Sequence, residues 1–251
     1  MPVSTERAPV LSVVMPAHNE ASYLEAAVRD VHGGLRARGH DVEVVVVENG
    51  STDETLAMAR RLADTTTGVR VSSRSVADYG AALRDGMLAA RGELIVTFDV
   101  DYYDLAFVDD ALRLVTGAAP APAIVVGSKR APGARDQRPW PRRLVTTVFS
   151  TLLHLVFSLS VSDTHGMKAM RHANVAPIAE RCRFRTDLFD TELVIRSERA
   201  GLMVTELPVT AEERRPSRTP IWRRVPRTVL GMVVLRVALW RGARPRRPAS
   251  S

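Results

Sequence analysis

The chain has 251 residues, of which 45% are hydrophobic, and this is enough to fill a sizeable core and to exclude disorder of the whole chain. Its single cysteine, Cys182, excludes an internal disulfide, and no group of cysteines and histidines has the spacing of a structural zinc site. The net charge of +7 is concentrated near the C-terminus, where eleven arginines fall from Arg214 to Arg247. Such a segment indicates either an anionic partner or a solvated basic end.

The first part of the chain alternates between β-rich runs and helical patterns. Apolar runs typical of strands stand at 11–15, 42–47, 69–71 and 93–98. Helical periodicity follows the first three of them, at 24–31, 56–62 and 81–90. The valines of 42–47 lack polar alternation, as in a strand that is buried on both faces of a parallel sheet. We therefore expect an α/β fold with helices on both faces of the sheet and a ligand site at the carboxyl edge.

The regular alternation ends after a predicted helix at 107–115. The later elements are a strand at 124–127, a loop at 131–141, an apolar helix at 144–160, a polar turn leading into a strand at 163–171, an amphipathic helix at 189–200 and a strand at 203–209. The simplest partition is one domain over residues 1–215 and a basic, partly helical tail over residues 216–251.

Two carboxylates, Asp99 and Asp101, follow the predicted strand at 93–98. Because one residue separates them on an extended backbone, they lie on the same side and can share a hard divalent cation, which neutralises a diphosphate leaving group. A triplet of this kind at a strand end is also typical of a helix N-cap in a solvated loop. The pair alone leaves both interpretations open.

Further motifs stand around this pair in a definite order. They are Pro16-Ala17-His18-Asn19-Glu20, Glu48-Asn49-Gly50-Ser51, Gly80, and Phe98-Asp99-Val100-Asp101. In this order and spacing the chain resembles, over about residues 11–210, the family 2 glycosyltransferases of the GT-A fold, which implies a Rossmann-like, open, mostly parallel sheet. The second half resembles the polyprenyl-phosphate sugar transferases of the dolichyl-phosphate mannose synthase type. The segments that carry this second resemblance are Gly127-Ser128-Lys129-Arg130, Asp163-Thr164-His165-Gly166-Met167-Lys168, Phe189-Asp190-Thr191-Glu192-Leu193 and Glu206-Leu207-Pro208-Val209.

The resemblance implies a site for a nucleotide-diphosphate sugar. The residues that it places around this donor are Pro16, Ala17, His18, Glu20, Glu48, Gly50, Ser51, Gly80, Asp99, Val100 and Asp101. It also implies that Asp99 approaches the ribose and diphosphate and that Asp101, together with Asp99, binds Mg²⁺ or Mn²⁺. Taken singly, Glu20 also suits the first turn of a helix, and Gly50-Ser51 suits an ordinary turn and cap.

Three positions depart from the pattern that the resemblance implies. Family members usually have Asp-Asp where this chain has Glu48-Asn49, and Gly-Lys-Gly where it has Asp78-Tyr79-Gly80. The lipid-linked branch often has a glutamine as a metal ligand where this chain has Tyr103. Because a neutral phenol is a poor ligand for a hard cation, either Asp104 or water takes that place or the metal is held weakly.

The acceptor side is predicted from charge. Arg130, Arg143 and Lys168 are candidates to bind an acceptor phosphate. A lipid phosphate is already ionised near neutral pH and needs no general base for an inverting attack, whereas a hydroxyl acceptor needs one, for which Asp190 is the candidate. With Asp99 and Asp101, Asp190 completes the set of candidate catalytic residues. We expect a glycosyltransferase that acts on a polyprenyl phosphate.

The sequence leaves two other functions open. The first is the same donor chemistry on a soluble hydroxyl acceptor, in cell-envelope or natural-product biosynthesis. The second is a non-catalytic nucleic-acid-binding protein, which the lack of aromatic residues between the basic ones disfavours, so no nucleic-acid partner is expected. The oligomeric state is left open by the sequence.

Membrane contact is predicted from two segments. The helix at 144–160 is apolar, but Thr147, Thr151, His154 and Ser158 form a polar stripe, which favours an interfacial or buried helix over a spanning one. A second apolar helix at 229–240 has arginines and tryptophans at its ends, as at a membrane interface, or packs on the domain or on a second copy. The start of the chain is too short and interrupted for a signal peptide, so we expect a cytoplasmic protein, peripheral on the inner face of the membrane.

Overall fold

The computed structural model describes residues 10–117, 119–137, 140–157, 159–184, 188–211 and 230–237. The strands are β1 (Leu11–Ala17), β2 (Val42–Asn49), β3 (Val69–Arg74), β4 (Leu94–Thr97), β5 (Ile124–Ser128), β6 (Arg135–Asp136), β7 (Lys168–Arg171), β8 (Val204–Pro208) and β9 (Thr210–Ala211). The helices are α1 (Leu24–Ala37), α2 (Thr55–Thr65), α3 (Tyr79–Ala89), α4 (Leu105–Thr116), α5 (Trp140–Phe157), α6 (His172–Arg181) and α7 (Phe189–Arg199). A further helix covers residues 230–237 and is called the C-terminal helix below.

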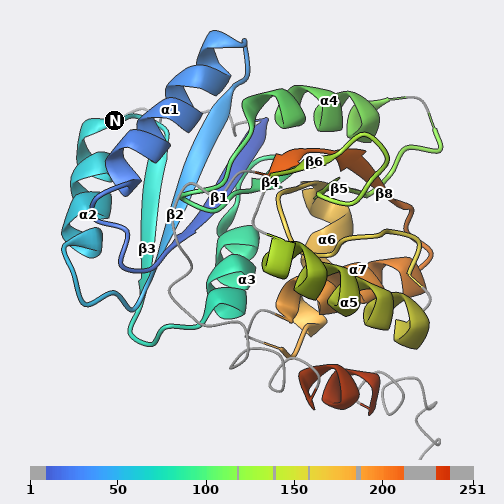
Figure 1. The fold of residues 1–251 in the computed structure, drawn as a ribbon. Coiled ribbons are helices and arrows are strands. Elements are labelled where there is room, and N and C mark those ends of the chain that lie inside the picture. Colours follow the sequence, from blue (N-terminus) through green and yellow to red (C-terminus); the bar gives the residue numbers. More distant parts are fainter. Residues whose placement is uncertain are drawn as a thin grey trace, which may run out of the picture.

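One seven-stranded sheet organises the molecule, in the order β3-β2-β1-β4-β7-β5-β8 (Figure 1). The pairs β1–β2, β2–β3, β1–β4 and β5–β8 are parallel. Strand β7 alone runs against its neighbours, β4 and β5. The predicted α/β fold with an open, mostly parallel sheet is therefore confirmed, and the carboxyl ends of β1, β2 and β4 meet at one edge.

The first half follows the predicted elements, whereas the second half adds three that the sequence patterns did not indicate, helix α6 and the short strands β6 and β9. Helix α6 directly follows β7 and contains Pro177 within its length. Strand β6 lies in the segment predicted as a loop at 131–141, where it pairs in parallel with β9 in a separate two-stranded sheet. The expected strand at 163–171 forms only from Lys168, so the residues before it remain a loop beside the site.

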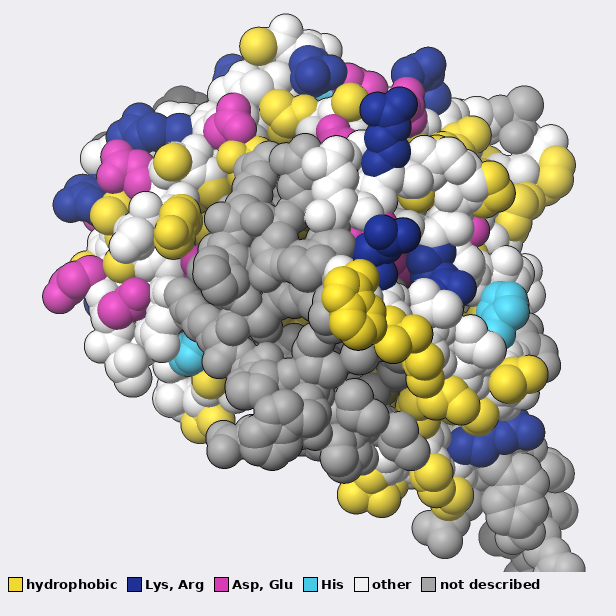
Figure 2. All heavy atoms as spheres, in the orientation of Figure 1, with side chains coloured by type: hydrophobic (Ala, Val, Ile, Leu, Met, Phe, Trp, Pro, Cys, Tyr) yellow, Lys and Arg dark blue, Asp and Glu magenta, His cyan; other side chains and the backbone are white. Residues whose placement is uncertain are grey.

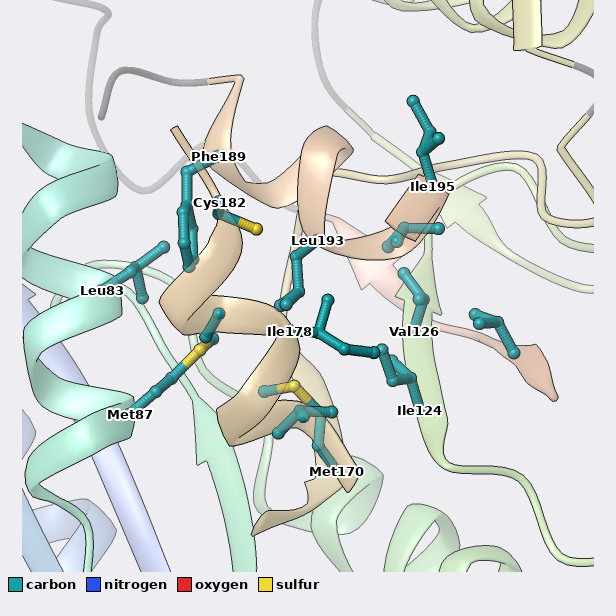
Figure 3. Close-up of a cluster of buried hydrophobic side chains, with 14 of the residues drawn as sticks. Leu83, Met87, Ile124, Val126, Met170, Ile178, Cys182, Phe189, Leu193 and Ile195 are labelled. Carbon is teal, nitrogen blue, oxygen red and sulfur yellow. The ribbon is translucent and has the colours of Figure 1, made fainter. Parts of the chain in front are cut away.

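Two hydrophobic cores lie on the two faces of the sheet. Along β1, Val13 and Met15 face a core with α1, α2 and α4, whereas Val14 faces a core with α3, α5, α6 and α7. Figure 3 shows the second core, in which Leu83 and Met87 of α3 lie near Phe189 and Cys182. Since all eight residues of β2 are buried, the valine run has the double burial that its pattern predicted.

The C-terminal helix packs on this second core. Its Met232 and Leu235 are buried there, and a β-carbon at Gly231 would lie 2.2 Å from Leu188 Cδ1, so the glycine permits a close approach. The described part of the predicted tail therefore packs on the domain. The tryptophans at the ends of the predicted helix at 229–240, Trp222 and Trp240, lie outside the described residues.

Helix α3 approaches the sheet closely at Gly86, which gives a test of the packing. A β-carbon there would lie 2.3 Å from Val14 Cγ1 and 2.9 Å from Val47 Cγ2. We expect Gly86→Ala to lower the free energy of unfolding by about 1–3 kcal/mol through overpacking, despite the better helix propensity of alanine.

Gly33 of α1 is the matched control, because nothing lies within 4 Å of a β-carbon built there. Gly33→Ala should instead raise the stability by up to about 1 kcal/mol. Urea unfolding of both variants measures the two effects, and equal effects of the same sign would contradict the close packing of α3.

Candidate functional site

The loops that follow β1 and β2 are joined by hydrogen bonds at the carboxyl edge of the sheet. The amide of Asn19 donates to Ser51 Oγ at 3.0 Å, and the amide of Glu20 donates to Thr55 Oγ1 at 2.7 Å. In return, the amide of Thr52 donates to Asn19 Oδ1 at 2.8 Å. Asn19 has a φ of 55°, a left-handed conformation that asparagine tolerates better than most residues. The structure thus brings the predicted donor loops 16–20 and 48–51 together.

Asn49 connects these loops to the entrance of α3. His18 Nδ1 lies 2.9 Å from the carbonyl oxygen of Asn49, and the amide of Asp78 donates to Asn49 Oδ1 at 2.8 Å. Glu48, beside it, is buried, and its Oε1 accepts from the amide of Ser51 at 2.5 Å. Both residues of the Glu48-Asn49 departure therefore have structural partners in the loops.

Asp99 and Asp101 stand at the end of β4, partly buried, with Val100 buried between them. Burial and the neighbouring charge of Asp101 raise the pKa of Asp99 to about 6, with a further contribution from Asp190. A hydrogen bond from the hydroxyl of Tyr79 to Asp99 Oδ1, at 3.0 Å, and the charge of Lys129 act in the opposite direction.

This crowding of carboxylates fits a divalent cation, which would relieve the repulsion between Asp99 and Asp101. Among the residues that the structure describes, no group of three or more His, Cys, Asp or Glu side chains is placed to hold a metal ion. Mg²⁺ commonly binds one or two carboxylates and takes its remaining ligands from phosphate and water. The two aspartates therefore fit a cation that is shared with a bound diphosphate.

Tyr103 and Asp104, which follow this pair, have other partners. The hydroxyl of Tyr103 donates to Asp30 Oδ2 at 2.8 Å, on α1. Asp104 is the N-cap of α4, where its Oδ1 accepts from the amides of Ala106 and Phe107 at 2.8 and 3.3 Å. The capping role that the sequence left open for Asp99 and Asp101 belongs to Asp104.

Lys168 and Asp190 form an ion pair in the interior. Nζ of Lys168 lies 2.7 Å from Asp190 Oδ1 and donates to the carbonyl oxygen of Gly166 at 2.9 Å. The Lys168 side chain is fully buried and that of Asp190 is 3% exposed. The structure thus brings together two residues that the sequence assigned to different roles, and it does not place Lys168 on a surface with the arginines.

The basic turn after β5 lies beside the carboxylates. Lys129 contributes to the charge environment of Asp99, and its Nζ lies 4.8 Å from the centre of the Tyr102 ring, a cation–π contact. The amide of Arg130 donates to Ser128 Oγ at 3.1 Å, and Nε of Arg130 is buried without a hydrogen-bond partner in the described part of the chain.

Arg143 lies apart from this turn in sequence and is exposed on α5. The sequence motifs include Lys129 and mark Tyr79 as a departure from the family pattern, but they assign neither residue a role beside Asp99. Only the fold shows that Tyr79 reaches Asp99 and that the charge of Lys129 acts on it.

The sequence model described as Glycosyl transferase family 2 matches residues 12–176. The chain belongs to glycosyltransferase family 2. Its members are enzymes that transfer a sugar from a nucleotide sugar, which agrees with the resemblance seen in the sequence motifs.

Several relatives cover most of the chain. Glycosyltransferase AglD of Haloferax volcanii is 30% identical over 227 residues, which are 88% of this chain and 35% of that protein, so the chain spans about a third of this relative. The uncharacterized glycosyltransferase Rv0539 of Mycobacterium tuberculosis is 30% identical over 80% of this chain and 84% of its own length. The dolichyl-phosphate beta-glucosyltransferase of Saccharomyces cerevisiae is 25% identical over 81% of this chain and 67% of its own.

Among solved structures, glucosyl-3-phosphoglycerate synthase from Mycobacterium tuberculosis in complex with UDP is similar in fold. The TM-score is 0.66 at 23% identity, over 91% of this chain and 80% of that one. Another structure of the same enzyme contains Mn²⁺ together with UDP and glucosyl-3-phosphoglycerate, with a TM-score of 0.65 at 21% identity over the same shares of both chains. This similarity confirms the GT-A-like architecture.

The buried ion pair gives a test of how Lys168 acts. Because removing one partner leaves an uncompensated buried charge, Lys168→Met should lower the free energy of unfolding by about 3–5 kcal/mol. The double variant Lys168→Met/Asp190→Leu should recover much of this loss, because no charge is then left unpaired. Thermal and urea unfolding measure both. If Lys168→Met were as stable as the unsubstituted protein, the ion pair between Lys168 and Asp190 would not contribute to stability.

Proposed function

We propose that the protein transfers a sugar, with inversion, from a nucleotide-diphosphate sugar to a polyprenyl phosphate at the cytoplasmic face of a membrane. The observation that carries this proposal is the position of Lys129, in the basic turn Lys129-Arg130, close enough to Asp99 for its charge to act on that carboxylate. An anionic acceptor drawn to this turn is held close to the point where the sugar leaves its diphosphate.

The donor side of the proposal rests on the joined loops at the carboxyl edge. The loops after β1 and β2 and the entrance of α3, with Gly80, surround the nucleotide, and Asp99 and Asp101 take the diphosphate through Mg²⁺ or Mn²⁺. When bound, the cation stabilises the negative charge that develops on the leaving diphosphate. The Mn²⁺ and UDP seen together in glucosyl-3-phosphoglycerate synthase support this choice of ligands.

The acceptor side rests on the chemistry of the second half. An acceptor phosphate oxygen attacks the anomeric carbon, the bond from that carbon to the donor diphosphate breaks, and the nucleoside diphosphate leaves. Because a phosphate is ionised near neutral pH, this attack needs no general base. Asp190, the candidate base for a hydroxyl acceptor, is buried and bonded to Lys168, which supports the phosphate acceptor.

Arg130, whose buried Nε has no hydrogen-bond partner among the described residues, and the exposed Arg143 are the proposed ligands of the acceptor phosphate. Lys168 is not proposed as a ligand of the acceptor phosphate, because its side chain is buried in the ion pair with Asp190. The name of the dolichyl-phosphate beta-glucosyltransferase among the relatives supports an acceptor of this class.

A thermal-shift panel of UDP- and GDP-sugars, with and without Mn²⁺, tests the donor site, because a ligand that binds only the folded state raises the melting temperature. Asp101→Asn should abolish the Mn²⁺-dependent part of the shift and lower turnover with a polyprenyl phosphate by about 100-fold or more. Asp110→Asn, which removes an exposed carboxylate of α4, is the control and should change neither. Unchanged turnover in Asp101→Asn, or turnover with a soluble hydroxyl acceptor alone, would contradict the proposal.

In the proposed function, the surface of the protein that contacts the membrane is formed by α5 and the C-terminal helix. Trp140, Leu144, Val148 and Leu155 stand on one side of α5 and are at least half exposed, and Figure 2 shows a run of hydrophobic side chains on the face where α5 lies in Figure 1. The hydroxyls of Thr147 and Thr151 donate to carbonyl oxygens of their own helix, so they add little polarity to that side.

On the C-terminal helix, Leu230, Val233, Val234 and Val237 are exposed on the side away from the core. Within the described residues, no helix has the length and apolar character needed to cross a bilayer. Two partly exposed apolar helices beside a basic sequence suit a peripheral contact with anionic lipid.

Flotation with phosphatidylglycerol-containing vesicles tests this contact. Leu144→Glu/Leu155→Glu should weaken vesicle binding by about tenfold or more, because two apolar side chains no longer enter the interface. The control is Leu114→Glu on α4, where the leucine is 39% exposed, and it should bind like the unsubstituted protein. Equal binding of all three proteins would contradict a role for α5 in membrane contact.

A further inference from the structure

Tyr79 links two parts of the site that come from distant strands. It is the first residue of α3, directly after the N-cap Asp78, whose side chain accepts from the amide of Ala81. From there its hydroxyl reaches Asp99 Oδ1, at 3.0 Å, beyond the end of β4. Its ring packs against the core that α3 shares with α6 and α7, which holds the hydroxyl in place.

The segment before Tyr79 is tied to the donor loop after β2. Gly50 has a φ of +64°, and a β-carbon there would lie 2.7 Å from the amide nitrogen of Ala77 and 2.9 Å from the carbonyl carbon of Val76. The amide of Asp78 also donates to Asn49 Oδ1. A shift of the loop at 49–51 therefore moves the entrance of α3 with it, and Tyr79 passes this shift to Asp99.

We propose that Tyr79 is a positioning residue that couples nucleotide binding to divalent-cation binding, through its hydrogen bond to Asp99. The proposal rests on the function proposed above. A nucleotide that orders the loop at 49–51 also fixes Tyr79, and the phenol then holds the Asp99 carboxylate in the orientation that receives the cation. By linkage, a cation bound at Asp99 and Asp101 tightens nucleotide binding by the same factor.

The size of the effect follows from the type of bond. A hydrogen bond to a charged group is worth enough to change an equilibrium constant about tenfold or more. Removing only the hydroxyl of Tyr79 should therefore lower the coupling factor about tenfold and leave the ring packing unchanged.

Isothermal titration calorimetry of UDP, with GDP in parallel, measures the coupling directly. For each protein, the ratio of the dissociation constants without and with Mn²⁺ is compared. Tyr79→Phe should lower this ratio about tenfold while changing nucleotide affinity without metal by less than about twofold. Tyr103→Phe is the matched control, because it removes a tyrosine hydroxyl that donates to a different carboxylate, Asp30, and its ratio should equal that of the unsubstituted protein.

A double-mutant cycle adds a second readout. If Tyr79 acts through Asp99, Tyr79→Phe in an Asp99→Asn background should cause no further loss of coupling. The inference is overturned by an unchanged ratio in Tyr79→Phe, by an equal loss of nucleotide affinity with and without Mn²⁺, or by additive losses in the double variant. Absence of any nucleotide binding by the unsubstituted protein would instead overturn the proposed function itself, which separates the two failures.

Discussion

The double burial of β2 is the constraint on which the site depends. Every residue of this strand is buried, and it pairs in parallel with β1 on one side and β3 on the other. Parallel pairing requires the chain to cross back through helices on the faces of the sheet, so the carboxyl ends of neighbouring strands collect at one edge. The loops at 17–20, 48–51 and 99–101 are neighbours for this reason, although residues 21–98 separate the first from the last.

Charge is the second organising feature, because the site gathers acidic groups at low exposure. Burial raises the pKa of Asp99, and Asp101 and Asp190 are close enough for their charges to raise it further. The chain offsets the charge in different ways on the two sides. Asp190 is paired with the buried Lys168, whereas the described part of the chain offers the Asp99 carboxylate a hydrogen bond from the neutral phenol of Tyr79 and the charge of Lys129. The charge of Asp190 is thus neutralised within the protein by Lys168. The carboxylates Asp99 and Asp101 at the end of β4 remain able to accept a divalent cation.

Sequence patterns predicted the first half of the fold well, because its elements are determined locally. Continuous apolar runs and helical periodicity are properties of short windows, and β1 to β4 with α1 to α3 follow them. The position of β7 was beyond such reasoning, since four residues say nothing about which strands they will join. The burial of Lys168 could not be predicted for the same reason. It follows from the place of β7 between β4 and β5, which puts the Lys168 side chain in the interior beside Asp190. The motifs indicated the members of the donor loops, but the partners of Glu48, Asn49 and Tyr79 emerge only when the loops are folded together.

The departures at Asn49 and Tyr79 make sense as a pair. Relative to the pattern that the resemblance implies, Asn49 replaces a negatively charged aspartate and Tyr79 replaces a positively charged lysine, while Asp78 replaces a glycine and adds a negative charge. The structure shows that they also belong to one chain of contacts, because Asn49 Oδ1 accepts from the amide of Asp78 and the next residue, Tyr79, donates to Asp99. The amide of Asn49 and the phenol of Tyr79 thus act through hydrogen bonds at two positions where the family pattern has charged residues. Since hydrogen bonds depend more strongly on direction than charge attraction does, this arrangement holds the Asp99 carboxylate in a defined orientation.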